Sequence, residues 1–138
     1  EPGKLEVVAY KAGREWARDT VQTAGEAAAL ALQPDRATIR ADGRDLSFVT
    51  VRVTDKNGIT APRAENRLTF TVEGPGEIVA TDNGDPRSFE PFASPARETF
   101  SGLCLVIVRA KPGQPGEIRL TATGEGLQPA ETRLSTIP

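Results

Sequence analysis

Carboxylates are the only side chains here that could serve as acid–base catalysts. The 138 residues contain no histidine and one cysteine, which excludes Ser-His-Asp, Cys-His and thiolate metal sites. Glycoside hydrolysis needs two carboxyl groups about 5–10 Å apart, and Asp82 and Asp85 are close enough in sequence to be considered as such a pair. A tight turn fits them better, because Asp and Asn side chains bond to nearby backbone N–H groups. We therefore expect no catalytic residue.

The same loop holds oxygen donors that could ligate calcium. However, Asp82, Asn83 and Asp85 lack the third alternating carboxylate and the closing glutamate of a calcium-binding loop. A phosphate loop is also missing, since Gly74-Pro75-Gly76 is not followed by Lys-Ser or Lys-Thr. We therefore expect neither a metal nor a cofactor.

Aromatic rings are the remaining feature on which a sugar could stack. Trp16 and Tyr10 lie near the N-terminus, and Phe89, Phe92 and Phe100 follow the Asp-Asn-Gly-Asp turn. The alternative is that the rings pack over the open ends of the fold, because a large loop without apolar anchors stays mobile. The candidate substrate-binding residues are Asp82, Asn83, Asp85 and Trp16.

Composition and charge restrict the class of protein. Hydrophobic residues make up 38% and charged residues 26%, and the net charge is −2 without a block of basic residues. This argues against nucleic-acid and membrane partners. The longest apolar run, residues 103–108, is too short to span a bilayer, and Cys104 within it is predicted to be buried. The sequence contains no methionine, so we expect an internal part of a longer protein.

Thirteen glycines and eleven prolines separate short runs of alternating apolar residues, which is typical of an all-β sandwich. Counted from Ala37, the runs predict about seven strands, as in an immunoglobulin-like fold. Residues 24–32 are interpreted as a linker entering a short strand. The predicted core consists of Val49, Val51, Val53, Leu68, Phe70, Val72, Leu105, Ile107, Ile118 and Leu120.

Before the sandwich, residues 4–10 and 15–23 flank Lys11-Ala12-Gly13-Arg14 and predict a β-hairpin with glycine in the turn. We divide the chain into this hairpin (residues 1–26) and the sandwich domain (residues 27–138). An isolated hairpin is marginal in water and exposes strand edges. We therefore expect it either to pack on the sandwich or to pair with another copy.

A set of short motifs extends over about residues 33–130. It consists of Asp35-Arg36-Ala37, Ala41-Asp42-Gly43-Arg44-Asp45-Leu46, Phe48-Val49-Thr50-Val51, Asp55, Gly58, Pro62, Asn66, Phe70, Gly74, Ile78, Ala80, Asp82-Asn83-Gly84-Asp85, Phe100, Gly102, Gly116 and Gly126-Leu127. Together these motifs resemble the final immunoglobulin-like domain of family 2 glycoside hydrolases, notably bacterial β-galactosidases.

The hairpin is similar to the closing strands of the preceding accessory domain in the same enzymes, through residues 3–11, Gly13 and residues 16–25. The resemblance implies a retaining parent enzyme that hydrolyses β-galactosides or related β-glycosides with two glutamates in an upstream (β/α)₈ barrel. The parent's other domains would be the partners of this one. Export to the periplasm or beyond is expected from the resemblance alone.

Three functions follow as alternatives. The leading interpretation is a non-catalytic structural accessory domain of that enzyme. The alternatives are a carbohydrate-binding module of the same enzyme and an immunoglobulin-like spacer of an adhesin. The sequence has no internal repeat of the kind that an adhesin array would show. An exposed aromatic platform would favour the binding module, and buried rings would argue against it.

Overall fold

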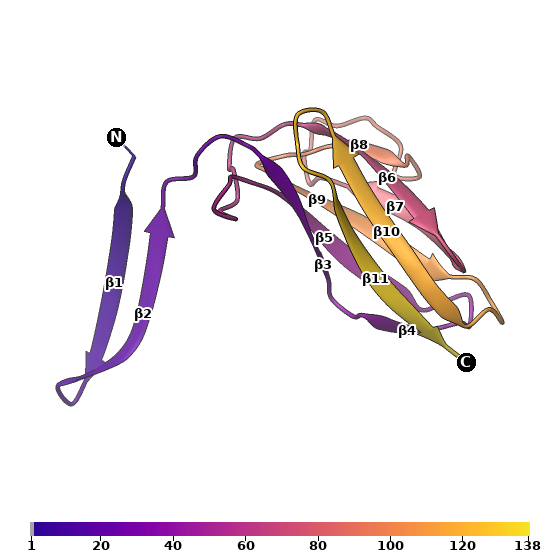
Figure 1. The fold of residues 1–138 in the computed structure, drawn as a ribbon, viewed down its shortest axis with the longest axis horizontal. Coiled ribbons are helices and arrows are strands. Elements are labelled where there is room, and N and C mark those ends of the chain that lie inside the picture. Colours follow the sequence, from indigo (N-terminus) through magenta and orange to yellow (C-terminus); the bar gives the residue numbers. More distant parts are fainter. Residues whose placement is uncertain (1) are drawn as a thin grey trace.

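The computed structural model describes residues 2–138, which form eleven β-strands (Figure 1). None of these residues belongs to a helix that could cross a membrane. The strands are β1 (Lys4–Lys11), β2 (Arg14–Gln22), β3 (Ala29–Pro34), β4 (Thr38–Arg40), β5 (Leu46–Thr54), β6 (Arg67–Glu73), β7 (Gly76–Asp82), β8 (Ala96–Glu98), β9 (Leu103–Ala110), β10 (Gly116–Gly124) and β11 (Ala130–Ile137).

From β3 onward, two sheets face each other. One has five strands in the order β4-β11-β10-β6-β8, and the other has four in the order β3-β5-β9-β7. Every neighbouring pair is antiparallel except β4 and β11. The predicted all-β, immunoglobulin-like sandwich is confirmed. From Ala37 onward it has eight strands, β4 to β11, where about seven were predicted. β8 has three residues and is too short to show alternation, and β3 is the short strand expected after the linker.

An aliphatic core fills the space between the sheets. Val49, Val51 and Val53 of β5 are fully buried, as the alternation predicts. The other predicted positions found in the core are Leu68, Phe70, Ile118 and Leu120, and Val72 is partly buried against it. Burial of each such side chain contributes about 1.5–3 kcal/mol, so these positions are the main source of stability.

Strand β9 turns the opposite face inward from the one predicted. Val51 pairs with Cys104, and Val49 pairs with Val106, and paired residues share a face of the sheet. Cys104, Val106 and Val108 therefore face the interior, while Leu105 and Ile107 lie half-buried on the outer face. The prediction that Leu105 and Ile107 belong to the core is wrong.

The one cysteine is part of this interior. Cys104 is 4% exposed, and desolvation raises the pKa of its thiol to about 12. The prediction of a buried, small apolar residue is confirmed. The thiol is therefore protonated and unreactive near neutral pH.

The N-terminal hairpin stands beside the sandwich and is joined to it through residues 23–28 (Figure 1). β1 and β2 pair in antiparallel register with a bulge at Ala9 and Tyr10. Ala12 and Gly13 have φ of 51° and 75°, so the predicted turn is confirmed. The hairpin strands do not lie against the sandwich, so the prediction that they pack on it is wrong. Pairing with another copy stays a prediction.

The two faces of the hairpin differ in polarity. One carries an ionic cluster in which Arg18 binds Glu15 and Glu6, and Lys4 lies 2.9 Å from Glu6. The other carries the cross-strand pair Leu5 and Val21, followed on β1 by Val7, and all three are more than 60% exposed. The second face thus exposes three apolar side chains next to Asp19, which pairs with Val7.

Candidate functional site

A long loop, residues 83–95, connects edge strand β7 of one sheet to edge strand β8 of the other. It is held from the inside by Arg97, which is 1% exposed. The guanidinium donates hydrogen bonds to the carbonyl oxygens of Thr81 (2.7 Å), Pro91 (2.8 Å) and Glu90 (3.0 Å), and its Nε donates to Thr81 Oγ1 (3.1 Å). Since a buried charged donor needs acceptors, this side chain fixes the path of the loop.

A second anchor of the loop is Glu90. Its carboxylate lies 2.6 Å from the Arg67 guanidinium and 3.9 Å from Arg97, and it accepts a hydrogen bond from Ser94 Oγ. The hydrogen bond from Arg67 is the main reason why the pKa of Glu90 is lowered, with a smaller contribution from Ser94. Glu90 is therefore ionised near neutral pH, so its charge is available to Arg67 and Arg97.

The Asp82–Asp85 segment is a turn built by side chains. Asp82 Oδ1 accepts hydrogen bonds from the backbone N–H groups of Asn83 (2.7 Å) and Gly84 (3.2 Å), and Asn83 Oδ1 accepts one from Asp85 (3.0 Å). Asp85 accepts hydrogen bonds from the backbone N–H and guanidinium of Arg87. The turn interpretation is confirmed.

These contacts limit what the two aspartates can do chemically. The Arg87 side chain and then its backbone N–H lower the pKa of Asp85, whereas a general acid in glycoside hydrolysis needs a raised one. Nowhere in residues 2–138 do three Asp, Glu, Cys or His side chains form a group that could hold a metal ion. The turn therefore suits a structural or hydrogen-bonding role better than catalysis.

Next to the turn lies a surface hollow of about 310 Å³. Asp82 and Asp85 line it together with Phe89 and Phe92. Phe89 is 99% exposed and Phe92 is 64% exposed, so the prediction that these rings pack over the end of the sandwich is wrong. Phe100 is half-buried, with the Arg87 guanidinium 5.9 Å from its ring centre. An anchored loop thus presents two apolar rings beside two carboxylates.

Trp16 belongs to a different part of the molecule. It is 72% exposed on β2, with the Lys11 ammonium 5.8 Å from its ring centre. The hairpin stands at one end of the structure, apart from the sandwich that contains β7 and β8 (Figure 1). The structure therefore brings Asp82, Asn83 and Asp85 together but leaves Trp16 far from them.

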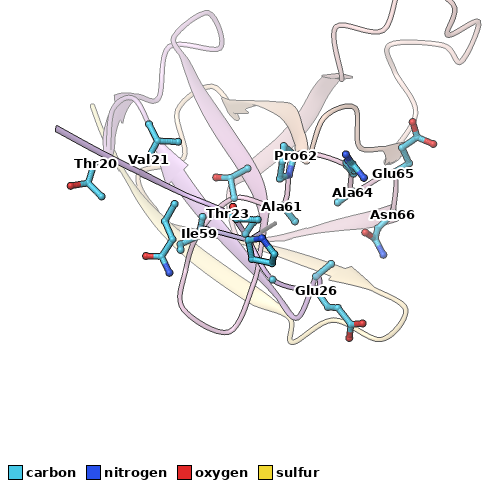
Figure 2. Close-up of a pocket in the computed structure, with 17 residues that line it drawn as sticks. Thr20, Val21, Thr23, Glu26, Ile59, Ala61, Pro62, Ala64, Glu65 and Asn66 are labelled. Carbon is cyan, nitrogen blue, oxygen red and sulfur yellow. The ribbon is translucent and has the colours of Figure 1, made fainter. Parts of the chain in front are cut away.

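A larger hollow, of about 1310 Å³, opens where the hairpin joins the sandwich. Figure 2 shows its lining, which comes from Pro2, residues 20–27 at the end of the hairpin, and residues 59–66 between β5 and β6. Most of these side chains are small or uncharged. The hollow has the character of a junction between two structural units rather than of a chemical site.

Asp55 ties the two sides of this junction together. It is 3% exposed and accepts hydrogen bonds from the backbone N–H groups of Gly25 (2.8 Å), Asn57 (2.8 Å) and Ile59 (3.0 Å). These bonds, the one from Gly25 foremost, lower its pKa. The sequence shows Asp55 only as the first residue of a turn, because the bond to Gly25 joins segments far apart in the chain.

Comparison with known proteins gives consistent results. Residues 30–133 match the family of glycoside hydrolase family 2 C-terminal domain 5. The chain is 45% identical over 135 residues to β-galactosidase BoGH2A from Bacteroides ovatus. The aligned region covers 98% of this chain and 16% of that enzyme.

Two solved structures resemble it closely. A β-glycosidase from Bacteroides vulgatus superposes with a TM-score of 0.92 at 31% identity, over 98% of this chain and 17% of that one. A glycosyl hydrolase family 2 member from Bacteroides cellulosilyticus gives 0.90 at 34% identity, over 99% and 17%. The chain thus spans about a sixth of the length of the relatives it matches.

Proposed function

Because the chain belongs to the glycoside hydrolase family 2 C-terminal domain 5 family, we propose that it is a non-catalytic structural domain of a larger, β-galactosidase-like enzyme. The observation that carries the proposal is coverage, since nearly all of this chain aligns with a small part of a β-galactosidase. The parent would hydrolyse terminal β-galactosides or related β-glycosides by a retaining mechanism, with its catalytic carboxylates outside these 138 residues.

The chemistry of the described residues supports a non-catalytic role. The sequence has no histidine, the cysteine is buried, and Asp85 is occupied by Arg87. A structural role also agrees with the buried hydrogen bonds of Arg97 and Asp55, because these bonds hold backbone segments together. Membership of an enzyme domain family also supports this role over that of an adhesin spacer.

We propose that the hairpin makes the contact with the preceding domain of the parent. Its exposed apolar face, formed by Leu5, Val7 and Val21, would be covered by that domain's remaining strands. In the isolated chain the same face is available to a second copy. Sedimentation would then show a dimer that dissociates to monomers on dilution.

The full-length protein is expected to hydrolyse a chromogenic β-galactoside, and the activity should appear in the periplasmic or secreted fraction. Residues 1–138 alone should show no turnover above buffer, because they lack a pair of carboxyl groups with separate acid and nucleophile environments. Chromogenic β-glucuronides and β-mannosides serve as matched substrates that define the sugar. Turnover by the isolated chain would contradict the non-catalytic assignment, and an inactive full-length protein would contradict the enzyme assignment.

A second candidate, a carbohydrate-binding module, is favoured by the 99% exposure of Phe89 beside Asp82 and Asp85. Rings that stack on sugars must be exposed, and carboxylates accept hydrogen bonds from hydroxyl groups. If this function holds, calorimetric titration of the chain with galacto-oligosaccharides should give a millimolar or tighter dissociation constant that Phe89→Ala weakens about tenfold, the equivalent of 1.4 kcal/mol. Trp16→Ala is the matched control on the distant hairpin. The absence of heat with the unmodified chain would rule the module out.

A further inference from the structure

The outer face of the four-stranded sheet carries a group of apolar side chains, interrupted by Thr50 and Asp82, which flank Leu105. Phe48 of β5 pairs with Ile107 of β9, and Ile107 pairs with Ala80 of β7. Leu105 and Leu103 follow on the same face of β9. Phe48 and Leu103 are 39% and 40% exposed, and the other three are half-buried. We call these five residues the outer apolar patch.

The corresponding face of the five-stranded sheet is entirely different. Its central strands present threonine and paired charges: Thr71 pairs with Thr121, and Arg119 lies 3.4 Å from Glu73. A further ion pair of 3.4 Å joins Arg133 to Glu117. This is the polar surface expected for a sheet that faces water. The contrast between the two faces shows that the outer apolar patch is not a general property of this sandwich.

One charged group beside the patch lacks a partner. Arg52 of β5 pairs with Leu103 in the sheet, its Nε is buried without a hydrogen-bond acceptor, and it forms no ion pair with any residue from 2 to 138. The other arginine on this face, Arg109, lies 2.8 Å from Glu77. A complementary partner surface would therefore be apolar and would place a hydrogen-bond acceptor opposite Arg52.

We propose that the outer apolar patch is the surface by which this domain packs against a neighbouring domain of the same polypeptide. The neighbouring domain supplies a carboxylate opposite Arg52. The inference rests on the proposed function, in which the chain is part of a larger enzyme. It explains the sequence of β9, Leu-Cys-Leu-Val-Ile-Val, because a strand that is buried on both faces is apolar without alternation.

The character of the patch separates a permanent neighbour from other occupants. A sugar would need several polar groups on the surface to fix its orientation. This face holds Thr50 and Asp82 beside Leu105, and the five apolar side chains of the patch outnumber them. A domain on the same chain is present at an effective concentration on the order of millimolar, which a free second copy does not reach in dilute solution. Permanent interfaces are also the more hydrophobic ones.

Two cysteine substitutions test this assignment by maleimide labelling. Thr50→Cys lies on the patch face of β5, opposite Leu105, and Thr71→Cys lies on the polar face of β6. Both threonines are exposed and mid-strand, so the pair is closely matched. The native Cys104 adds little background because it is buried. Each variant is labelled in the 138-residue chain and in the full-length protein.

In the isolated chain, the two variants should be labelled at similar rates. In the full-length protein, the maleimide should label Thr50→Cys about tenfold more slowly than Thr71→Cys, or slower still, because labelling of Thr50→Cys then requires the interface to open. Equal rates in the full-length protein would overturn the proposal. If the labelling rate of Thr50→Cys in the isolated chain falls as the protein concentration rises, the patch binds a second copy instead. The readout is independent of glycosidase activity, which is measured separately and tests the proposed function.

Discussion

Replacing Val51 by aspartate is expected to abolish the folded sandwich. Val51 is fully buried in the middle of β5, an inner strand of the four-stranded sheet. The substituted carboxylate would have only apolar neighbours in the core, and burial of an unpaired charge costs several kcal/mol even after the surroundings relax. That cost is comparable to the whole stability of a domain this size, about 5–15 kcal/mol. The variant should therefore show no cooperative thermal transition by circular dichroism.

Thr71→Asp is the control for this experiment. Thr71 lies on an inner strand of the other sheet but points to solvent, so the same side chain is introduced without burial. We expect its melting curve to stay close to that of the unmodified chain. A Val51→Asp variant that melts normally would mean that β5 presents its other face to the core.

The second large effect is expected for Arg97→Ala. Removal of the guanidinium leaves the carbonyl oxygens of Thr81, Glu90 and Pro91 without this donor and leaves a cavity behind. Breaking a buried charged network of this kind costs about 3–5 kcal/mol. Urea denaturation should show a lower midpoint, and limited proteolysis should show new cleavage within residues 83–95.

Arg87→Ala is the appropriate control, because Arg87 holds Asp85 in the same loop but its side chain is 75% exposed. It should change the urea midpoint little, since exposed ion pairs add little stability. Equal destabilisation by the two substitutions would show that Arg97 is not the main anchor of the loop. Unchanged proteolysis in Arg97→Ala would show that the loop is held by other contacts, such as those of Glu90 with Arg67 and Ser94.

Alternation along a strand indicates which face is buried only where the other face is polar. β5, β6 and β10 alternate between apolar and polar residues, and this alternation indicated the buried face of each strand correctly. β9 has apolar residues on both faces, so its inner face is set by its register with β5, which the sequence does not contain. β8 could not be predicted either, because three residues hold no detectable period.

The same distinction applies to the candidate site. The Asp82–Asp85 turn was predictable because its hydrogen bonds join residues close in sequence. Arg97 and Asp55 were missed as anchors, since their acceptors and donors come from segments brought together by the fold. The exposure of Phe89 was mispredicted because the loop obtains its rigidity from a buried arginine and does not need an aromatic anchor.

The link between hairpin and sandwich has a consequence for how an intact enzyme would unfold. The hairpin passes into β3 through a few residues, and Asp55 clamps that passage at Gly25. If a neighbouring domain takes up the hairpin as its own last strands, the two domains share continuous backbone with no free linker between them. Loss of either one would then remove an edge or an anchor from the other, so the pair would behave as a single cooperative unit. Heating would then unfold both domains in one transition, and proteases would cut at the outer ends of the pair before they cut between the hairpin and β3.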